Sequence, residues 1–179
     1  MLGSGPVGLL GAMALAAGGF TTFVYSREPE PNAKADLVKA IGGRYLSAID
    51  TAIEDLPKKI GNVDVVYEAT GASRVSFDVM KVLGTNGVLV FTGVPGRKSP
   101  IDVDTDLIMR NLVLKNQVVF GTVNAGRETF EAAVQDLGVF MRRSAAAVPA
   151  LITGRFPVSA HRDLLLGTAT GIKNVLRFG

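Results

Sequence analysis

The sequence predicts an α/β fold, a doubly wound parallel sheet, and three observations support this prediction. Short β-rich runs alternate with helical patterns along the 179 residues. Residues 88–92 are nearly continuous in apolar side chains, which is typical of a parallel strand that is buried on both faces. A glycine-rich turn at residues 3–8 leads directly into an apolar helical run. We therefore expect one domain over residues 1–179.

In the first half of the chain, periodicity and punctuating residues define the expected elements. The helix over residues 5–17 is rich in Ala, Leu and Met and stops at Gly18, which is suited to end a helix. Asn32 is suited to cap a helix over residues 33–41. The other expected elements are strands over residues 20–25, 44–46 and 63–69 and a helix over residues 73–83.

In the second half, strands are expected over residues 88–92 and 118–120, each followed closely by a glycine. Residues 128–141 form an amphipathic helical pattern. Its apolar side consists of Phe130, Ala133, Val134, Leu137 and Met141. A short helix near residues 162–166 and a last strand over residues 174–178 complete the expected fold.

The first strand of the sheet is expected to be truncated. It should precede Gly3, yet only Met1 and Leu2 stand there, whereas a strand usually has about 5 residues. In the strand order 3-2-1-4-5-6 this strand is the central one. We expect either a fragment of a longer protein or a gene product whose start was assigned too late.

Composition excludes several classes of function. The net charge is only +3 and the Lys and Arg residues are scattered, so we expect no nucleic-acid partner. No apolar run reaches the roughly 18 residues that cross a membrane, and no positive segment precedes the apolar residues 7–19, so we expect a cytoplasmic protein without a membrane partner. There is no cysteine and one histidine, and a catalytic zinc site usually needs three protein ligands. We therefore predict no metal site and no catalytic residue in this chain.

The turn Gly3-Ser4-Gly5-Pro6-Val7-Gly8 carries the main motif. Gly3 permits a tight turn, Gly5 lets the backbone approach a pyrophosphate, and Gly8 lets the helix pack closely on the strand. The N–H groups at the start of the helix then face the phosphates. The pattern predicts a site for NAD or NADP, and the alternative is a glycine-rich helix cap without a ligand.

The residues after the second expected strand bear on the choice of cofactor. An Asp or Glu usually binds the ribose 2′-OH of NAD at this position, but here Ser26 and Arg27 stand there. Both can bind a 2′-phosphate, which favours NADP. Glu28 lies about 20 residues past the last glycine, where the acid is expected, so use of both cofactors is the main alternative.

Several stretches of the chain resemble the C-terminal, cofactor-binding half of the zinc-dependent medium-chain glucose 1-dehydrogenases of archaea and bacteria. The resemblance covers nearly the whole chain and is strongest over residues 63–137. The stretches that carry it are residues 3–10, 24–27, 68–72, 87–96, 114–125 and 130–133.

The resemblance implies roles for particular residues. The loop Gly5, Pro6, Val7 and Gly8 would hold the pyrophosphate, and Asn124 would also bind the sugar. At the 2′ end of the adenosine ribose stand Ser26, Arg27 and Glu28. Around the nicotinamide and the rest of the cofactor stand Thr70, Phe91, Thr92, Gly93, Thr122, Val123 and Asn124. Lys173 resembles a basic residue that reaches the cofactor phosphates.

The resemblance also implies what the chain does. Members of this family oxidise an aldose at C1 and pass hydride to NADP or NAD, with a zinc ion in an N-terminal domain that this chain does not contain. Residues 154–179 would be a tail that returns toward that domain, and this chain alone would be inactive. A homo-oligomer is expected, with residues 101–117 at the contact. The alternatives are another medium-chain alcohol or polyol dehydrogenase, a stand-alone dinucleotide-binding module without catalysis, or a non-functional gene remnant.

Three other groups are interpreted as structural. Asp64 and Glu68 could form an acid pair, but solvation at a strand edge is the preferred interpretation. His161 is interpreted as a surface residue. The acidic run Asp102, Asp104 and Asp106 lacks the glycine and terminal glutamate of a calcium loop, so a solvated loop is expected.

Overall fold

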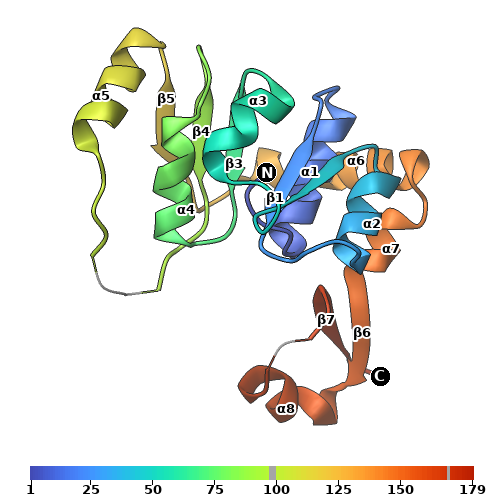
Figure 1. Cartoon of the computed structure of the whole chain (residues 1–179). Coiled ribbons are helices and arrows are strands. Elements are labelled where there is room, and N and C mark those ends of the chain that lie inside the picture. The colour runs from blue at the N-terminus through green and yellow to red at the C-terminus, as the bar shows by residue number, and fades with distance from the viewer. Residues whose placement is uncertain (97–99, 169) are drawn as a thin grey trace.

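The computed structural model describes residues 1–96, 100–168 and 170–179 and has the predicted α/β architecture (Figure 1). Strand β1 (Phe23–Ser26) pairs in parallel with β2 (Arg44–Ser47). Strands β3 (Val65–Glu68), β4 (Val88–Phe91) and β5 (Val118–Gly121) form a second parallel set. The expected alternation of strands and helices is confirmed.

The two sets of strands are joined by the first residues of the chain. The Leu2 N–H donates to the Tyr67 carbonyl over 2.9 Å, and the Gly3 N–H donates to the Tyr25 carbonyl over 2.9 Å. Leu2 thus bridges β1 and β3 in parallel. The order across the sheet is β2, β1, Leu2, β3, β4, β5, which corresponds to the expected 3-2-1-4-5-6 with a central strand reduced to a bridge.

Helices cover both faces of this sheet (Figure 1). Asn32 caps α2, since its side-chain oxygen accepts from the Ala35 N–H over 2.9 Å. Asp104 caps α5 in the same way, through the Leu107 N–H at 3.0 Å. The helices are α1 (Pro6–Ala17), α2 (Ala33–Ala40), α3 (Leu56–Ile60), α4 (Ser73–Asp78), α5 (Thr105–Leu114), α6 (Arg127–Arg143), α7 (Ala147–Leu151) and α8 (His161–Leu166). Short 3-10 turns lie at Ile53–Asp55, Val79–Lys81 and Val158–Ala160.

The core consists of two clusters, one on each face of the sheet. Val24 belongs to one cluster and its neighbour Tyr25 to the other, because successive strand side chains point to opposite faces. The first cluster joins α1, α2, α6 and α7, and the second joins α3, α4 with its 3-10 turn, and α5. Leu9 is fully buried in the first cluster, where truncation to Ala would cost about 2–5 kcal/mol.

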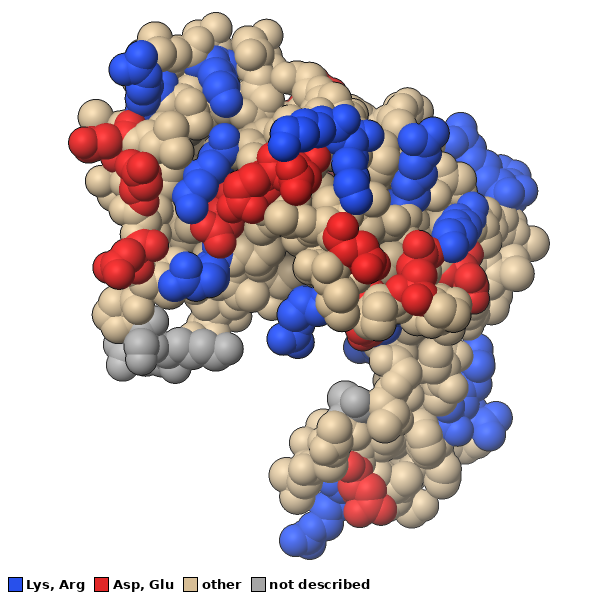
Figure 2. Space-filling model, viewed as in Figure 1, with Lys and Arg blue, Asp and Glu red and all other residues tan. Residues whose placement is uncertain are grey.

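The C-terminal residues form a separate module (Figure 1). Strand β6 (Ile152–Pro157) pairs in parallel with β7 (Lys173–Arg177), and α8 lies between them in sequence. The predicted last strand over residues 174–178 therefore exists, one residue earlier along the chain. Figure 2 shows this module standing apart from the main body. Among the described helices none combines the length and the apolar character that crossing a bilayer requires.

Candidate cofactor site

The glycine-rich turn follows Leu2 at the carboxyl edge of the sheet. Gly3 has a φ of +98°, a region that favours glycine, and a Cβ there would lie 2.9 Å from the Thr70 Cγ2 atom. A Cβ on Gly8 would lie 2.2 Å from the Gly3 carbonyl oxygen, so only glycine allows α1 to approach the turn so closely. Both glycines are required by the backbone geometry of this turn.

Gly5 is different, because among the described residues no atom beyond its two chain neighbours lies within 4 Å of the position that its Cβ would occupy. It is the N-cap of α1 and has extended backbone angles, φ −73° and ψ 177°. Pro6 opens the helix, and the first turn contains no acidic residue. Val7 and Gly8 lie in the first turn of α1, where the helix offers no carbonyl four residues earlier to accept from their N–H groups. These N–H groups therefore remain available to a ligand. This end of α1, with its positive dipole and an open space beside Gly5, fits a pyrophosphate.

The end of β1 lies beside this turn. The Ser26 hydroxyl is 2.8 Å from the hydroxyl of Ser4, so the two loops are tied together by a direct hydrogen bond. Arg27 is exposed. Glu28 forms an ion pair with Lys34, a residue of α2 that the sequence analysis did not single out. Ser26, Arg27 and Glu28 thus form one continuous surface that begins at the phosphate turn.

Glu68 organises the ends of β3 and β4. Its side chain is buried, with 1% exposure, so the interpretation of Glu68 as a solvated strand-edge residue was wrong, whereas Asp64 is exposed. The carboxylate accepts hydrogen bonds from the Thr70 N–H at 2.6 Å, from the Gly71 N–H at 2.9 Å, from the Gly93 N–H at 3.2 Å and from the Thr70 hydroxyl. Backbone donors of this kind satisfy a buried carboxylate without a cation.

The end of β4 continues toward β5. The Thr92 hydroxyl donates to the Glu68 carbonyl over 2.7 Å, and the Thr122 N–H donates to the Phe91 carbonyl over 2.9 Å. Val123 and Asn124 follow on an exposed segment. The turn at residues 3–8, Thr70, residues 91–93 and residues 122–124 therefore all lie at the carboxyl edge of one parallel sheet, where ligands bind in such folds.

The remaining candidates lie elsewhere. Lys173 is the first residue of β7, in the separate C-terminal module, and its role at the phosphates stays a prediction. His161 is exposed, as expected, and its Nδ1 lies 3.0 Å from the Val158 carbonyl. Asp102 and Asp104 are exposed and precede α5, as expected of a solvated loop, although Asp104 also caps that helix, whereas Asp106 lies within the helix. In residues 1–96, 100–168 and 170–179 no three His, Cys, Asp or Glu side chains gather as a metal site requires.

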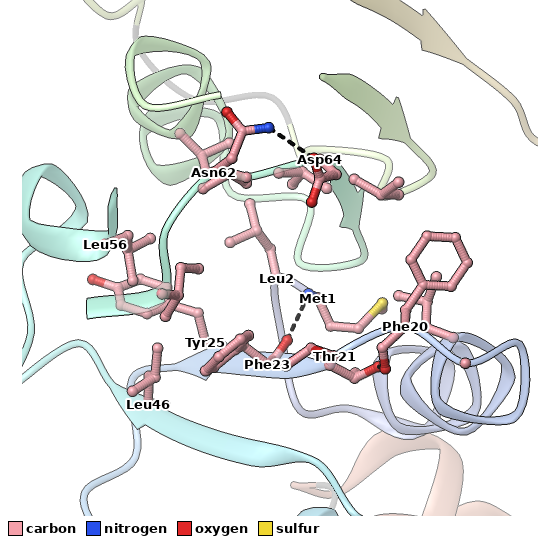
Figure 3. A pocket seen from close by; sticks show the side chains of 18 residues that line it. Met1, Leu2, Phe20, Thr21, Phe23, Tyr25, Leu46, Leu56, Asn62 and Asp64 are labelled. Carbon is pink, nitrogen blue, oxygen red and sulfur yellow. Dashed lines mark hydrogen bonds between the residues drawn. The ribbon is translucent and has the colours of Figure 1, made fainter. Parts of the chain in front are cut away.

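A cavity of about 550 Å³ lies at the opposite, amino edge of the sheet (Figure 3). Its walls come from the segments that lead into β1 and β3, and Met1 and Leu2 lie between them. The α-amino group of Met1 donates to the Phe23 carbonyl over 2.8 Å. Because this cavity is at the wrong edge for the phosphate turn, we do not assign the cofactor to it.

Strand order, helices on both faces and a glycine turn at the start of α1 place the chain in the class of Rossmann-type α/β domains. The chain belongs to the family described as glucose dehydrogenase C-terminus, whose model matches residues 1–178. The resemblance stated from the sequence is thereby confirmed.

Curated relatives include the glucose 1-dehydrogenase of Halobacterium salinarum, 33% identical over 99% of this chain and 50% of that protein. The glucose 1-dehydrogenase 1 of Caldivirga maquilingensis is 35% identical over 98% of this chain and 48% of its own length. The crystal structure of Haloferax mediterranei glucose dehydrogenase in complex with NADP, Zn and gluconolactone is 29% identical and has a TM-score of 0.84. It is covered over 50% of its length, and this chain over 99%. The chain thus spans about half the length of these relatives.

Sequence reasoning did not single out Lys34, gave Ser4 no role of its own within the turn, and assigned Glu68 to a solvated strand edge. The partners of Lys34 and Ser4 come from other loops, six and 22 residues away along the chain. A signal for Glu68 does exist, since an acid followed by Thr70-Gly71 at a strand end offers neighbouring backbone donors. Recognising it also requires the Gly93 N–H, which is 25 residues away.

Proposed function

We propose that this chain is the cofactor-binding half of a glucose 1-dehydrogenase and that it binds NADP, with NAD as a second cofactor. The observation that carries the proposal is the start of α1, where an open Gly5 and free N–H groups face the carboxyl edge of the sheet. The family membership and the NADP in the Haloferax structure support it.

In this proposal a bound cofactor would supply the hydride acceptor: the aldose would lose a hydride from C1 and a proton from the C1 hydroxyl. The residues of this chain bind and orient the cofactor. Gly5, Val7 and Gly8 hold the pyrophosphate, and residues 26–28 meet the adenosine ribose. Residues 91–93 and 122–124 border the nicotinamide, with Thr70 nearby and Lys173 reaching toward the phosphates. Asn124 offers both donors and acceptors to a sugar hydroxyl.

The zinc ion is assigned to a further domain, because the described part of this chain brings no ligand set together. A zinc ion in that domain would polarise the C1 hydroxyl. We therefore expect this chain alone to show no glucose-dependent reduction of NADP. Residues 154–179 are proposed to return toward that domain, and a cytoplasmic location and the absence of nucleic-acid and membrane partners stay predictions from the sequence.

A substitution at Gly5 tests cofactor binding. Gly5→Val should fold, because the backbone is extended and the space is open, but its side chain would fill the place of the pyrophosphate. Gly126 is a matched control, since it is the N-cap of α6 with φ −76°, ψ 171° and equally open space. Titration followed by the fluorescence of NADPH measures the binding. Binding that is lost in Gly5→Val and kept in Gly126→Val supports the proposal; equal binding by both variants contradicts it.

A second candidate is a dehydrogenase of another alcohol or polyol. An alcohol dehydrogenase from Thermotoga maritima is 27% identical, with a TM-score of 0.75 over 92% of this chain and 45% of that structure. Rates of the longer protein with glucose, other aldoses and simple alcohols separate the two candidates. A preference for simple alcohols would favour the second.

A homo-oligomer through residues 101–117 and the adjoining edge strand is part of the proposal. On β5, Val118 and Phe120 are 52% and 47% exposed, and Met109 and Val113 of α5 are also exposed. An edge strand with apolar side chains invites pairing. Light scattering on Phe120→Lys should show a smaller mass than on the unmodified chain, and an unchanged mass would exclude this contact.

A further inference from the structure

The loop between β1 and α2 contains a charge pair at the point where the adenosine ribose would be bound. The Lys34 ammonium donates to the Glu28 carboxylate. The Lys34 side chain is 21% exposed and that of Glu28 is 48% exposed. Glu28 is the residue at the spacing where an acid usually binds the 2′-OH of NAD. In this structure, however, the Glu28 carboxylate already forms an ion pair with the ammonium group of Lys34, which lies in the following helix, α2.

The backbone around this pair is held by hydrogen bonds. The hydroxyl of Tyr45, a buried residue of β2, donates to the Glu28 carbonyl over 3.0 Å. The Asn32 side chain donates to the Pro29 carbonyl over 2.9 Å and accepts from the Ala35 N–H over 2.9 Å. Both ends of the pair are thus fixed, since Glu28 is tied to the sheet and Lys34 lies in the first turn of a capped helix.

The charges of this loop decide which ribose it can accept. An unpaired Glu28 would accept a hydrogen bond from a 2′-OH and would repel a 2′-phosphate. Paired with Lys34, it contributes little net charge, and the exposed Arg27 next to it leaves the local sum at one positive charge. A phosphate near Arg27 and the Ser26 hydroxyl then meets an attractive field.

We propose that Lys34 is a specificity-determining residue that favours a 2′-phosphorylated dinucleotide by neutralising Glu28. The inference rests on the proposed binding of NADP and deepens it. Lys34 acts through Glu28, not by contact with the cofactor. Removal of the Lys34 charge releases the carboxylate, which then opposes the 2′-phosphate and accepts the 2′-OH of NAD.

Two small ligands isolate this effect from the rest of the cofactor. Adenosine 2′,5′-bisphosphate carries the 2′-phosphate, whereas adenosine 5′-monophosphate carries the free 2′-OH. Calorimetric titration of the full chain with each gives the ratio of the two dissociation constants. The variants are Lys34→Met, Glu28→Gln and the double variant. Lys39→Met is the matched control, because Lys39 lies on the same helix as Lys34 and pairs with Glu30 of the preceding loop.

We expect Lys34→Met to weaken binding of the bisphosphate about tenfold, which corresponds to about 1.4 kcal/mol. Binding of the monophosphate should be unchanged or up to about twofold tighter, because the released carboxylate accepts its 2′-OH. Adding Glu28→Gln should restore the bisphosphate affinity, a rescue that a purely structural role of Lys34 would not produce. An unchanged ratio in Lys34→Met, an equal change in Lys39→Met, or no rescue would overturn the role of Lys34 while leaving the proposed function intact. Failure of the unmodified chain to bind either ligand would overturn both.

Discussion

The carboxylate of Glu68, at the end of β3, accepts a 3.2 Å hydrogen bond from the Gly93 N–H, which lies just beyond the end of β4. The approach is close enough to exclude any side chain at Gly93, because a Cβ there would lie 2.3 Å from the Gly71 nitrogen and 2.6 Å from the Glu68 Oε2 atom. One buried carboxylate therefore sets the relative position of two segments that we propose to contact the cofactor.

Glu68→Gln should destabilise the chain. The amide keeps the volume of the side chain but replaces one acceptor oxygen by a donor that faces other donors, which costs about 1–3 kcal/mol for each buried group left unsatisfied. Urea unfolding measures this loss directly. Asp64→Asn is the control, since the Asp64 side chain is exposed and its carboxylate accepts a 2.7 Å hydrogen bond from the Asn62 amide rather than from buried backbone groups. Equal stability of the two variants would show that the Glu68 bonds contribute nothing.

Gly93→Ala should be more harmful than its size suggests. The added methyl overlaps backbone atoms of Gly71, which cannot move without breaking the bond to Glu68. Overpacking of this kind costs about 1–3 kcal/mol. Gly126→Ala adds the same methyl in open space and should change the free energy of unfolding little. If thermal unfolding gave the same loss for both, the close approach at Gly93 would not matter for stability.

The stability of the 179-residue chain should rise between pH 5 and pH 8 because of one amine. Burial lowers the pKa of the Met1 α-amino group from 8.0 to about 5. Between these values the unfolded chain binds a proton that the folded chain does not, so the free energy of unfolding increases with pH, by up to about 4 kcal/mol over the window. Above pH 8 and below pH 5 this group adds no further pH dependence.

An acetylated Met1 is the control for this amine, because it carries no ionisable amine. The difference in unfolding free energy between the free and the acetylated chain, measured by urea unfolding at several pH values, should vanish above pH 8 and grow toward pH 5. A difference that is constant with pH would exclude the buried amine as its source.

A short apolar extension before Met1 should stabilise the chain. Along β3 and its flanking residues, the carbonyls of Asp64 and Glu68 accept hydrogen bonds from N–H groups on the β4 side. The Tyr67 carbonyl and the Ala69 N–H point the other way and bond to the backbone of Leu2. By continuation of this alternation, the backbone groups of Val65 face the 550 Å³ cavity, whereas the Val63 carbonyl already accepts from the Gly84 N–H over 2.9 Å. An extended segment there would gain about 0.5–1.5 kcal/mol per hydrogen bond, and each kcal/mol shifts the melting temperature by about 2–4 °C. An extension with proline at alternate positions should give no such rise.

Much of the fold followed from local patterns. The Asn32 cap and the glycine requirement of the first turn are visible in short stretches of sequence, and the strand order followed from the fold class that these patterns indicate. The strand expected over residues 20–25 begins only at Phe23, because its pairing with β2 begins there, between Phe23 and Arg44. Helix α5 was not predicted, and its cap Asp104 was interpreted as part of a solvated loop.

The candidate site was predictable only in part, for a physical reason. A glycine at a tight turn is dictated by its own backbone, so a sequence can reveal it. The bonds of Glu68 and the pair of Glu28 with Lys34 depend on how separate segments meet in space. Such contacts have no local signature, and the residues that arrange the site are therefore harder to find than those that line it.

The bridge at Leu2 is the connection between the two halves of the sheet during unfolding. The β1–β2 pair and the β3–β4–β5 set have separate cores and share the backbone bonds of Met1, Leu2 and Gly3. Loss of these bonds would divide the sheet into two cooperative units that exchange their amide hydrogens independently. The loop that we assign to the pyrophosphate follows directly after these bridging residues, so a bound phosphate would also stabilise the contact between the two units.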